Sequence, residues 1–124
     1  MTDDLTRTIA RSVWHGWGDP AERHTVPSHA WAFLEREIGA SPLASRDLPV
    51  PLADVVLPEP ALTAAARAAL EAVVGAPQVR DDHATRVEHA GGKSFPDLVR
   101  IRRGDGSHAP DVVVFPGSPE EVQQ

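Results

Sequence analysis

The residues best suited to chemistry lie in a polar, glycine-containing stretch from 81 to 97. This stretch carries two permanent cations, a histidine that titrates near neutral pH and a hydroxyl group, which are Arg86, Lys93, His89 and Ser94. Together they suit a phosphate or carboxylate group of a substrate, because charged donors form strong hydrogen bonds with anions. The alternative is a solvated loop in which Arg86 pairs with Asp82 or Glu88. The residues alone leave both interpretations open.

A second cluster, WHGWG at 14–18, places His15 between two tryptophans and next to glycine. Tryptophan fills cores and also covers ligands, whereas glycine lets the backbone turn where a side chain would clash. We interpret the cluster first as a turn packed on a core, with His15 at the surface. The alternative is an element that faces a ligand.

The chain's six histidines do not form a metal-binding pattern. None is paired at i+2 or at i+4 on a predicted helix, and no HExxH motif is present. We therefore predict no metal site. No set of residues in this sequence is assigned a catalytic role.

Composition limits the classes of function. A chain of 124 residues with a net charge of −6 is a single domain or less and lacks the basic surface that binding to nucleic acid or an anionic membrane requires. It has no cysteine for disulfides or thiolate metal sites, no secretory signal and no stretch of about 20 apolar residues that would cross a bilayer. We expect a cytoplasmic protein, and the dominance of arginine over lysine suggests a bacterial source.

Two helices are predicted in the first part of the chain. The helix at 28–38 has Ser28 as its N-cap and Gly39 as its stop, and its apolar face is formed by Trp31, Leu34 and Ile38. The helix at 61–74 ends at Gly75 and pairs Arg67 with Glu71. We expect this second helix to be the most persistent element of the isolated chain.

The rest of the chain is predicted as extended segments and turns. Residues 39–60 are rich in proline and form an extended arm whose apolar side chains need a cover. Residues 98–103 (LVRIRR) are predicted as a strand, 104–110 as a turn, and 111–116 (DVVVFP) as a strand buried in a sheet.

The last residues carry the signals of a helix start, but too few residues follow to complete a stable helix. Ser118 is a predicted N-cap, Pro119 suits the first helical position and Glu121 completes a capping box. An isolated helix needs about 12–15 residues to be stable, and far fewer follow here. We therefore expect an α/β domain that begins near residue 110 and is incomplete, with residues 116–124 frayed.

Five elements in this order resemble FAD-linked oxidases of the vanillyl-alcohol-oxidase and PCMH type, in the branch of bacterial oxidoreductases related to alkyldihydroxyacetonephosphate synthase. They are WHGWG at 14–18, Ile38-Gly39, the arm from Pro42 to Pro60, RVEHAGGKS at 86–94 with Arg103-Gly104 after it, and PDVVVFPGSPEEV at 110–122. The chain has Gly91 where the eukaryotic synthases have histidine, which leaves open whether the parent reaction is ether-lipid synthesis or simple oxidation.

The resemblance implies an α+β fold in which a lead-in region, 1–109, runs into the first strand and helix start of an FAD-binding domain, 110–124. It implies FAD as the cofactor of the parent enzyme, with Phe115, Pro116 and Gly117 as the flavin contacts at the strand end. The glycine-rich loop that cradles the flavin pyrophosphate in this family is absent from the sequence, so we do not expect the chain to bind FAD alone. The expected partner is the remainder of the enzyme, or a second copy in an oligomer. The alternative is a stand-alone interaction domain, or a relic of a split gene, without catalytic function.

Overall fold

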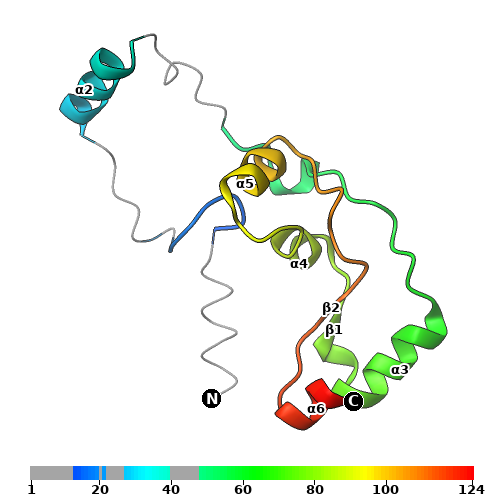
Figure 1. Ribbon diagram of the computed structural model, residues 1–124. Helices are drawn as coiled ribbons and strands as arrows, with labels where there is room; N and C mark the ends of the chain where they lie inside the picture. The colour runs from blue at the N-terminus through cyan, green and yellow to red at the C-terminus, as the bar shows by residue number, and fades with distance from the viewer. Residues whose placement is uncertain (1–12, 20, 22–26, 40–47) are drawn as a thin grey trace.

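The computed structural model describes residues 13–19, 21, 27–39 and 48–124, and Figure 1 shows its α+β arrangement. The part of the predicted arm at 40–47 lies outside the described residues. The described elements, in chain order, are α2 (Ser28–Ile38), η2 (Leu52–Asp54), α3 (Ala64–Val74), η3 (Ala76–Gln78), β1 (Val79–Arg80), α4 (His83–Glu88), α5 (Phe95–Arg102), β2 (Val113–Val114) and α6 (Pro119–Gln123). None of these helices is long and apolar enough to cross a membrane.

The helices α2 and α3 match the two helices predicted from periodicity, with small corrections at their starts. Pro27, not Ser28, holds the N-cap position of α2, and no side chain caps it. Helix α3 begins at Ala64 because the hydroxyl of Thr63 accepts a 3.2 Å hydrogen bond from the amide of Ala66. Neither helix contains a buried residue, so their apolar stripes are only partly covered.

The prediction of a strand at 98–103 is wrong, because these residues lie in or next to α5. Ser94 caps this helix, and a proline in its first turn favours helix initiation. The alternation of apolar and basic residues suggested a strand. Leu98 and Ile101, three positions apart, instead form the buried face of a helix.

The polar stretch from 81 to 97 is also more ordered than the predicted loop. Asp82 caps α4 by accepting a 3.0 Å hydrogen bond from the amide of Thr85. Thr85, Arg86 and Val87 are buried within this short helix. A local cap and contacts with distant segments thus order a stretch that has no clear periodicity.

The sheet consists, in the described part of the chain, of β1 and β2 in antiparallel register, with Val79 opposite Val114 and Arg80 opposite Val113. The strand predicted at 111–116 is present but shorter, and its valines are half-buried rather than buried. Its only partner strand among the described residues is β1, which explains the incomplete burial. The predicted turn at 104–110 is present, and Gly104 adopts a φ of 89° there.

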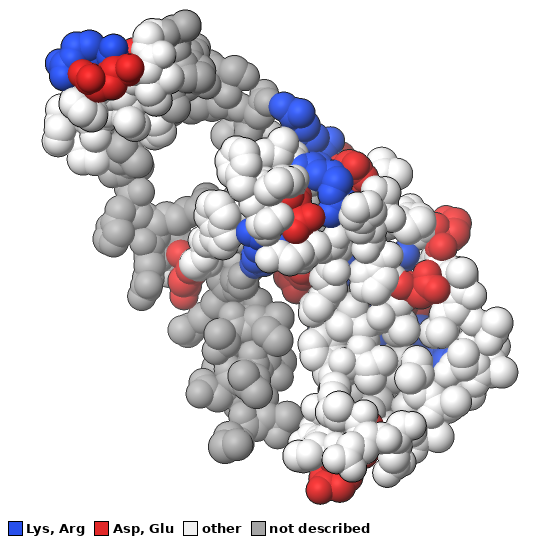
Figure 2. All heavy atoms as spheres, viewed as in Figure 1, with Lys and Arg blue, Asp and Glu red and all other residues white. Residues whose placement is uncertain are grey.

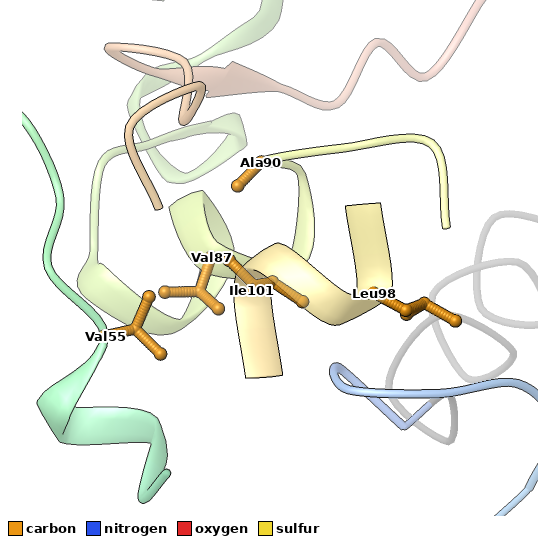
Figure 3. Packing of buried hydrophobic residues seen from close by; sticks show 5 residues of the cluster. All are labelled: Val55, Val87, Ala90, Leu98 and Ile101. Atoms are coloured by element: carbon orange, nitrogen blue, oxygen red, sulfur yellow. The ribbon is translucent and has the colours of Figure 1, made fainter. Parts of the chain in front are cut away.

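The core lies between the arm, α4 and α5 (Figure 3), and consists of Val55, Val87, Ala90, Leu98 and Ile101. Trp14 packs against this cluster from the N-terminal side. Val55 of the arm is 2% exposed, so part of the arm is covered by the core, whereas Leu48 is 81% exposed. The core is therefore small and formed by segments that lie far apart in the sequence.

One half of the predicted capping box is present in α6, and the other half is shifted by one residue. The hydroxyl of Ser118 accepts a hydrogen bond from the amide of Glu121. The Glu121 carboxylate in turn accepts one from the amide of Gly117, at 2.6 Å. The carboxylate thus bonds the residue before the N-cap rather than the N-cap itself, and the two hydrogen bonds fix the backbone that follows β2.

Candidate functional site

Arg86 is a buried cation held by backbone carbonyl groups. Its Nη2 donates to the carbonyl oxygen of Pro58 and its Nε to that of Pro110, both at 2.7 Å. The alternative interpretation, in which Arg86 pairs with Asp82 or Glu88, is therefore wrong. Since the side chain is 5% exposed, the guanidinium joins the arm to the segment before β2.

Lys93 and the WHGWG turn hold each other in place. The Lys93 ammonium donates a 3.0 Å hydrogen bond to the carbonyl of Val13, and the Trp17 Nε1 donates one of 3.0 Å to the carbonyl of Lys93. Trp14 packs on the core while Trp17 is 64% exposed. The turn is thus fastened to the body of the molecule, as the first interpretation proposed, but one tryptophan remains at the surface.

Ser94 acts locally at the start of α5. Its hydroxyl donates to the Asp97 carboxylate at 2.8 Å and accepts from the Asp97 amide at 3.4 Å. The hydrogen bond from Ser94, followed by one from Arg100, holds the pKa of Asp97 below its usual value. The hydroxyl is therefore engaged in ordering the helix.

His89 meets the end of β2. Its ring lies edge-on to the ring of Phe115, with 5.9 Å between the centroids, and its Nδ1 lies 2.8 Å from the carbonyl oxygen of Thr85. Because a carbonyl only accepts, Nδ1 carries the proton of this hydrogen bond, and in the neutral ring Nε2 has the free lone pair. A histidine held in this way can accept a hydrogen bond at Nε2.

Arg80 completes this group, which we call the Phe115 cluster: Arg80, His89 and Phe115. The guanidinium carbon of Arg80 lies 5.9 Å from the centroid of the Phe115 ring. Sequence analysis missed Arg80. The signal that could have found it is strand register, because Arg80 lies opposite Val113 and thus on the same face of the sheet as Phe115, two residues further along.

The charge of the Phe115 cluster is balanced by Asp82. Arg80 Nε lies 3.2 Å from the Asp82 carboxylate, and both side chains are about half exposed. Partial burial raises the pKa of Asp82, but the hydrogen bonds from Thr85 and the charge of Arg80 outweigh this, so the net pKa lies below its usual value. The cluster therefore presents an aromatic ring between a paired cation and an imidazole ring.

Pro116 and Gly117 follow the Phe115 cluster directly. Proline has no amide hydrogen, and the amide of Gly117 already donates to Glu121. This strand end therefore offers apolar surface rather than free amide donors for an anion.

The predicted site residues do not converge on one cavity. His89 alone joins the predicted flavin contacts, while Arg86, Lys93 and Ser94 act at three other places. An open cavity of about 430 Å³ lies between the arm and the turn after α5, lined by Val56, Leu57, Pro58, Arg103, Gly104, Asp105 and Ser107, and contains none of the predicted residues. Among the described residues, no group of histidine and carboxylate side chains is arranged to hold a metal ion.

Comparison with solved structures identifies the class of protein that has this fold. One structure of alkyldihydroxyacetonephosphate synthase, crystallised in space group P212121, matches 93% of this chain with a TM-score of 0.74 and 26% identity, and a second, in P1, matches 93% with a TM-score of 0.70 and 24% identity. The matches cover 24% and 25% of those chains. The present chain thus has the fold of a part of that enzyme, about a quarter of its length.

Sequence comparison identifies closer relationships. The chain is 29% identical over 135 residues to alkyldihydroxyacetonephosphate synthase of Dictyostelium discoideum, covering 90% of this chain and 22% of that enzyme. It is 37% identical over 107 residues to protein Rv2250A of Mycobacterium tuberculosis, covering 86% of this chain and 70% of the relative. No protein-family profile matches it. The chain belongs to the same family as protein Rv2250A.

Proposed function

We propose that this chain is the N-terminal portion of an FAD-dependent oxidoreductase related to alkyldihydroxyacetonephosphate synthase, with its flavin domain beginning at residue 110. The observation that carries the proposal is the match to the solved synthase, with a TM-score of 0.74 over 93% of the chain. Because the match covers only a quarter of that enzyme, the other segments would supply the redox chemistry. A cytoplasmic location is part of the proposal, and the lack of cysteine supports it.

The described residues do not fit the pyrophosphate of FAD. A pyrophosphate site needs several free amide donors that approach the phosphates closely. At the end of β2, the Gly117 amide is bound to Glu121, and the carboxylates of Glu120 and Glu121 follow in the first turn of α6. These carboxylates would repel the phosphates. We therefore propose that the chain by itself neither binds FAD nor catalyses a reaction.

The contribution of this chain to a complete enzyme would be apolar and positional. Phe115, Pro116 and Gly117 would contact the flavin through their apolar surface. Among the substrate-binding candidates, we retain His89, because its Nε2 is available for a proton or a hydrogen bond beside Phe115. For Arg86, Lys93 and Ser94 we propose positioning roles, because each of them donates hydrogen bonds to groups of the chain itself.

The remainder of the enzyme is the proposed partner, and exposed aromatic side chains support this. Trp17 is 64% exposed and Phe95 is 72% exposed. The Trp17 indole donates to the carbonyl of Lys93, which precedes Phe95 by two residues. Two large apolar side chains near one helix start are typical of a surface that another polypeptide covers.

A chimera tests the proposal. Residues 1–124 would replace the aligned segment of the Dictyostelium synthase, and the purified chimera would be analysed for bound FAD by its absorbance after gel filtration. We expect a flavin-loaded chimera and a colourless isolated chain, with the intact synthase as the positive control. A folded chimera without flavin, or an isolated chain that retains flavin, would contradict the proposal.

A second candidate function is a stand-alone, non-catalytic interaction domain. It is favoured by protein Rv2250A, of which this chain spans 70%, compared with 22% of the Dictyostelium synthase. The DNA that follows the codon for Gln124 separates the two. A coding segment for a glycine-rich phosphate loop in any frame supports the oxidoreductase, whereas unrelated sequence there supports the interaction domain.

A further inference from the structure

The WHGWG turn is fastened to α5 and to the loop before it (Figure 1). On the face shown in Figure 2, lysine and arginine side chains gather around α5. The Lys93 ammonium donates to the carbonyl of Val13, and Arg102 Nη1 donates to the carbonyl of His15 at 3.3 Å. In return, the Trp17 indole donates to the carbonyl of Lys93. The turn and the body of the molecule thus hold each other through side chains.

Residues 13–18, which we call the strap, make their backbone hydrogen bonds within the turn itself. The Gly16 amide donates to the carbonyl of Val13 at 3.3 Å, and the Val13 amide donates to the carbonyl of Gly18 at 3.4 Å. Among the described residues, no backbone-to-backbone hydrogen bond joins the strap to another segment. The strap can therefore leave the body without breaking a helix or the sheet, as locally opening segments do.

One apolar contact holds the strap on the core. Trp14 packs against the core cluster, and Val13 is 6% exposed. A cavity of about 10 Å³ remains beside Trp14, lined among others by Lys93 and Leu98. This volume is close to what one water molecule needs, so the packing under the strap is incomplete.

Lys93 adopts a left-handed backbone conformation, with a φ of 57°, and it is the only described residue other than glycine that does so. This conformation costs free energy in a residue with a Cβ, whereas glycine adopts it freely. Such outliers persist where the surrounding structure holds them, and they are common in switch regions. The strap binds Lys93 at both its ammonium and its carbonyl group. Opening of the strap would free both groups and let this backbone relax.

We propose that the strap is a conformational latch that opens as a unit while α4 and α5 stay folded, with Lys93 as the residue that locks it. In the closed state, Trp14 covers the core and the Lys93 amine is held at Val13. In the open state, the apolar side of α5 and this amine both become accessible. Lys93 is the only lysine of the sequence, so its side-chain amine is a specific reporter of the opening.

The latch would respond to the proposed partner. Trp17 belongs to the strap and also to the exposed aromatic surface that we assign to the remainder of the enzyme. A polypeptide that covers Trp17 would bind the closed state better than the open one and would hold the strap closed. This consequence rests on the proposed function, whereas the opening of the strap in the isolated chain does not.

Acetylation of Lys93 by N-acetoxysuccinimide measures the opening in the full chain. The amine nitrogen forms an amide bond with the acetyl carbon, the bond from that carbon to the N-hydroxysuccinimide oxygen breaks, and the proton passes to water. Mass spectrometry of the peptide that contains Lys93 gives the rate and separates it from reaction at the N-terminal amine. Trp17→Phe removes the indole donor but keeps an aromatic ring, and should raise the rate about tenfold, as the loss of one hydrogen bond allows. Trp31→Phe makes the same change in α2 as the matched control and should leave the rate unchanged. Amide exchange at Ile101 should be the same in all three chains, because the core stays folded.

Two substitutions of Lys93 separate its charge from its backbone conformation. Lys93→Ala and Lys93→Gly both remove the ammonium, but only glycine also removes the cost of the left-handed conformation. The exchange of the Trp17 indole hydrogen, followed by NMR, should therefore be about threefold slower in the glycine variant than in the alanine variant. Both variants should exchange this hydrogen faster than the unmodified chain.

Equal acetylation rates in the unmodified chain and in Trp17→Phe would overturn the proposal, because the strap would then not guard the amine. A faster rate together with faster exchange at Ile101 would overturn it too, since the whole chain would then be opening. If Trp17→Phe does not fold, the Lys93 variants decide, and equal indole exchange in the two refutes the lock. A chimera that retains flavin while the isolated chain shows no opening would refute the latch and leave the proposed function intact.

Discussion

The guanidinium of Arg86 donates a 2.7 Å hydrogen bond to the carbonyl oxygen of Pro58, across 28 positions of the chain. The same side chain reaches Pro110 on its other side. A buried charge that is paired only with carbonyl dipoles is costly unless its hydrogen bonds are well formed. Arg86 therefore helps to fix the arm against the segment before β2, together with the backbone hydrogen bond from Gly106 to Val56.

Replacing Arg86 is expected to destabilise the fold. Arg86→Ala leaves two carbonyl groups without their donor and should lower the free energy of unfolding by about 2–4 kcal/mol, measured by urea denaturation. Arg86→Lys should lose less, but not recover fully, because an ammonium group lacks the planar fork that spans both carbonyls. Arg36→Ala serves as the control, since that side chain is 71% exposed, and should change stability by less than about 0.5 kcal/mol. Equal stability of the Arg86 and Arg36 variants would refute this role.

The N-cap of α4 gives a second prediction. Asp82→Ala removes the acceptor of the Thr85 amide and hydroxyl hydrogen bonds, and should cost about 1 kcal/mol in thermal or urea unfolding. Asp82→Asn retains a cap acceptor and should cost less. If alanine and asparagine have equal effects, Asp82 acts through its charge on Arg80 rather than as a cap.

The stabilising effect of Asp82 should depend on pH. Its pKa in the folded chain lies below the ordinary value of 3.8, so the folded state favours the ionised carboxylate. The stability it contributes is complete above the unfolded pKa and is lost as the pH falls through the folded pKa. The difference in unfolding free energy between the unmodified chain and Asp82→Ala should therefore be constant near neutral pH and shrink below pH 3.8. A difference that grows on acidification contradicts this.

Gly106 is predicted to tolerate no larger side chain. A Cβ at this position would lie 2.9 Å from the carbonyl oxygen of Val56 and 3.0 Å from Val55 Cγ1, and would collide with the side chain of Leu57. Gly106→Ala should therefore lower the free energy of unfolding by about 1–3 kcal/mol, because backbone and core must both move. Gly92→Ala is the control, since the nearest atom to its Cβ would be 3.8 Å away. Equal melting temperatures for the two variants would contradict the close approach.

Hydrogen exchange should protect α5 more strongly than α3. The sequence predicted the 61–74 helix as the most persistent element, but α3 contains no buried residue, whereas Leu98 and Ile101 of α5 belong to the core. Amides in elements with few buried contacts open more readily. Residue-resolved exchange measured by NMR should therefore show slower exchange at Ile101 than at Leu70. The reverse order would restore the prediction from sequence.

The sequence by itself determined those features that depend on contacts between residues close together in the chain. The stop of α2 at Gly39, the Arg67 to Glu71 pair and the Ser118 cap of α6 each involve residues within four positions of one another. Short-range geometry is the same whatever surrounds it, so propensity and capping rules suffice. The motif order from WHGWG to PDVVVFP was also sufficient to indicate the synthase-like fold, which the solved structures confirm.

Only the tertiary structure decided between helix and strand where the apolar pattern is compatible with both. It also decided which groups the buried polar side chains bond. The stretch LVRIRR alternates like a strand, yet Leu98 and Ile101 became the buried face of α5 because the arm and α4 offer a core on one side. Arg86 donates to the carbonyl oxygens of Pro58 and Pro110 rather than to nearby carboxylates. A buried guanidinium needs hydrogen-bond partners, and the fold rather than the local sequence supplies them. His89 contacts Phe115 for the same reason. Contacts between residues 20 or more positions apart depend on how distant segments pack, and no short stretch of sequence specifies that packing.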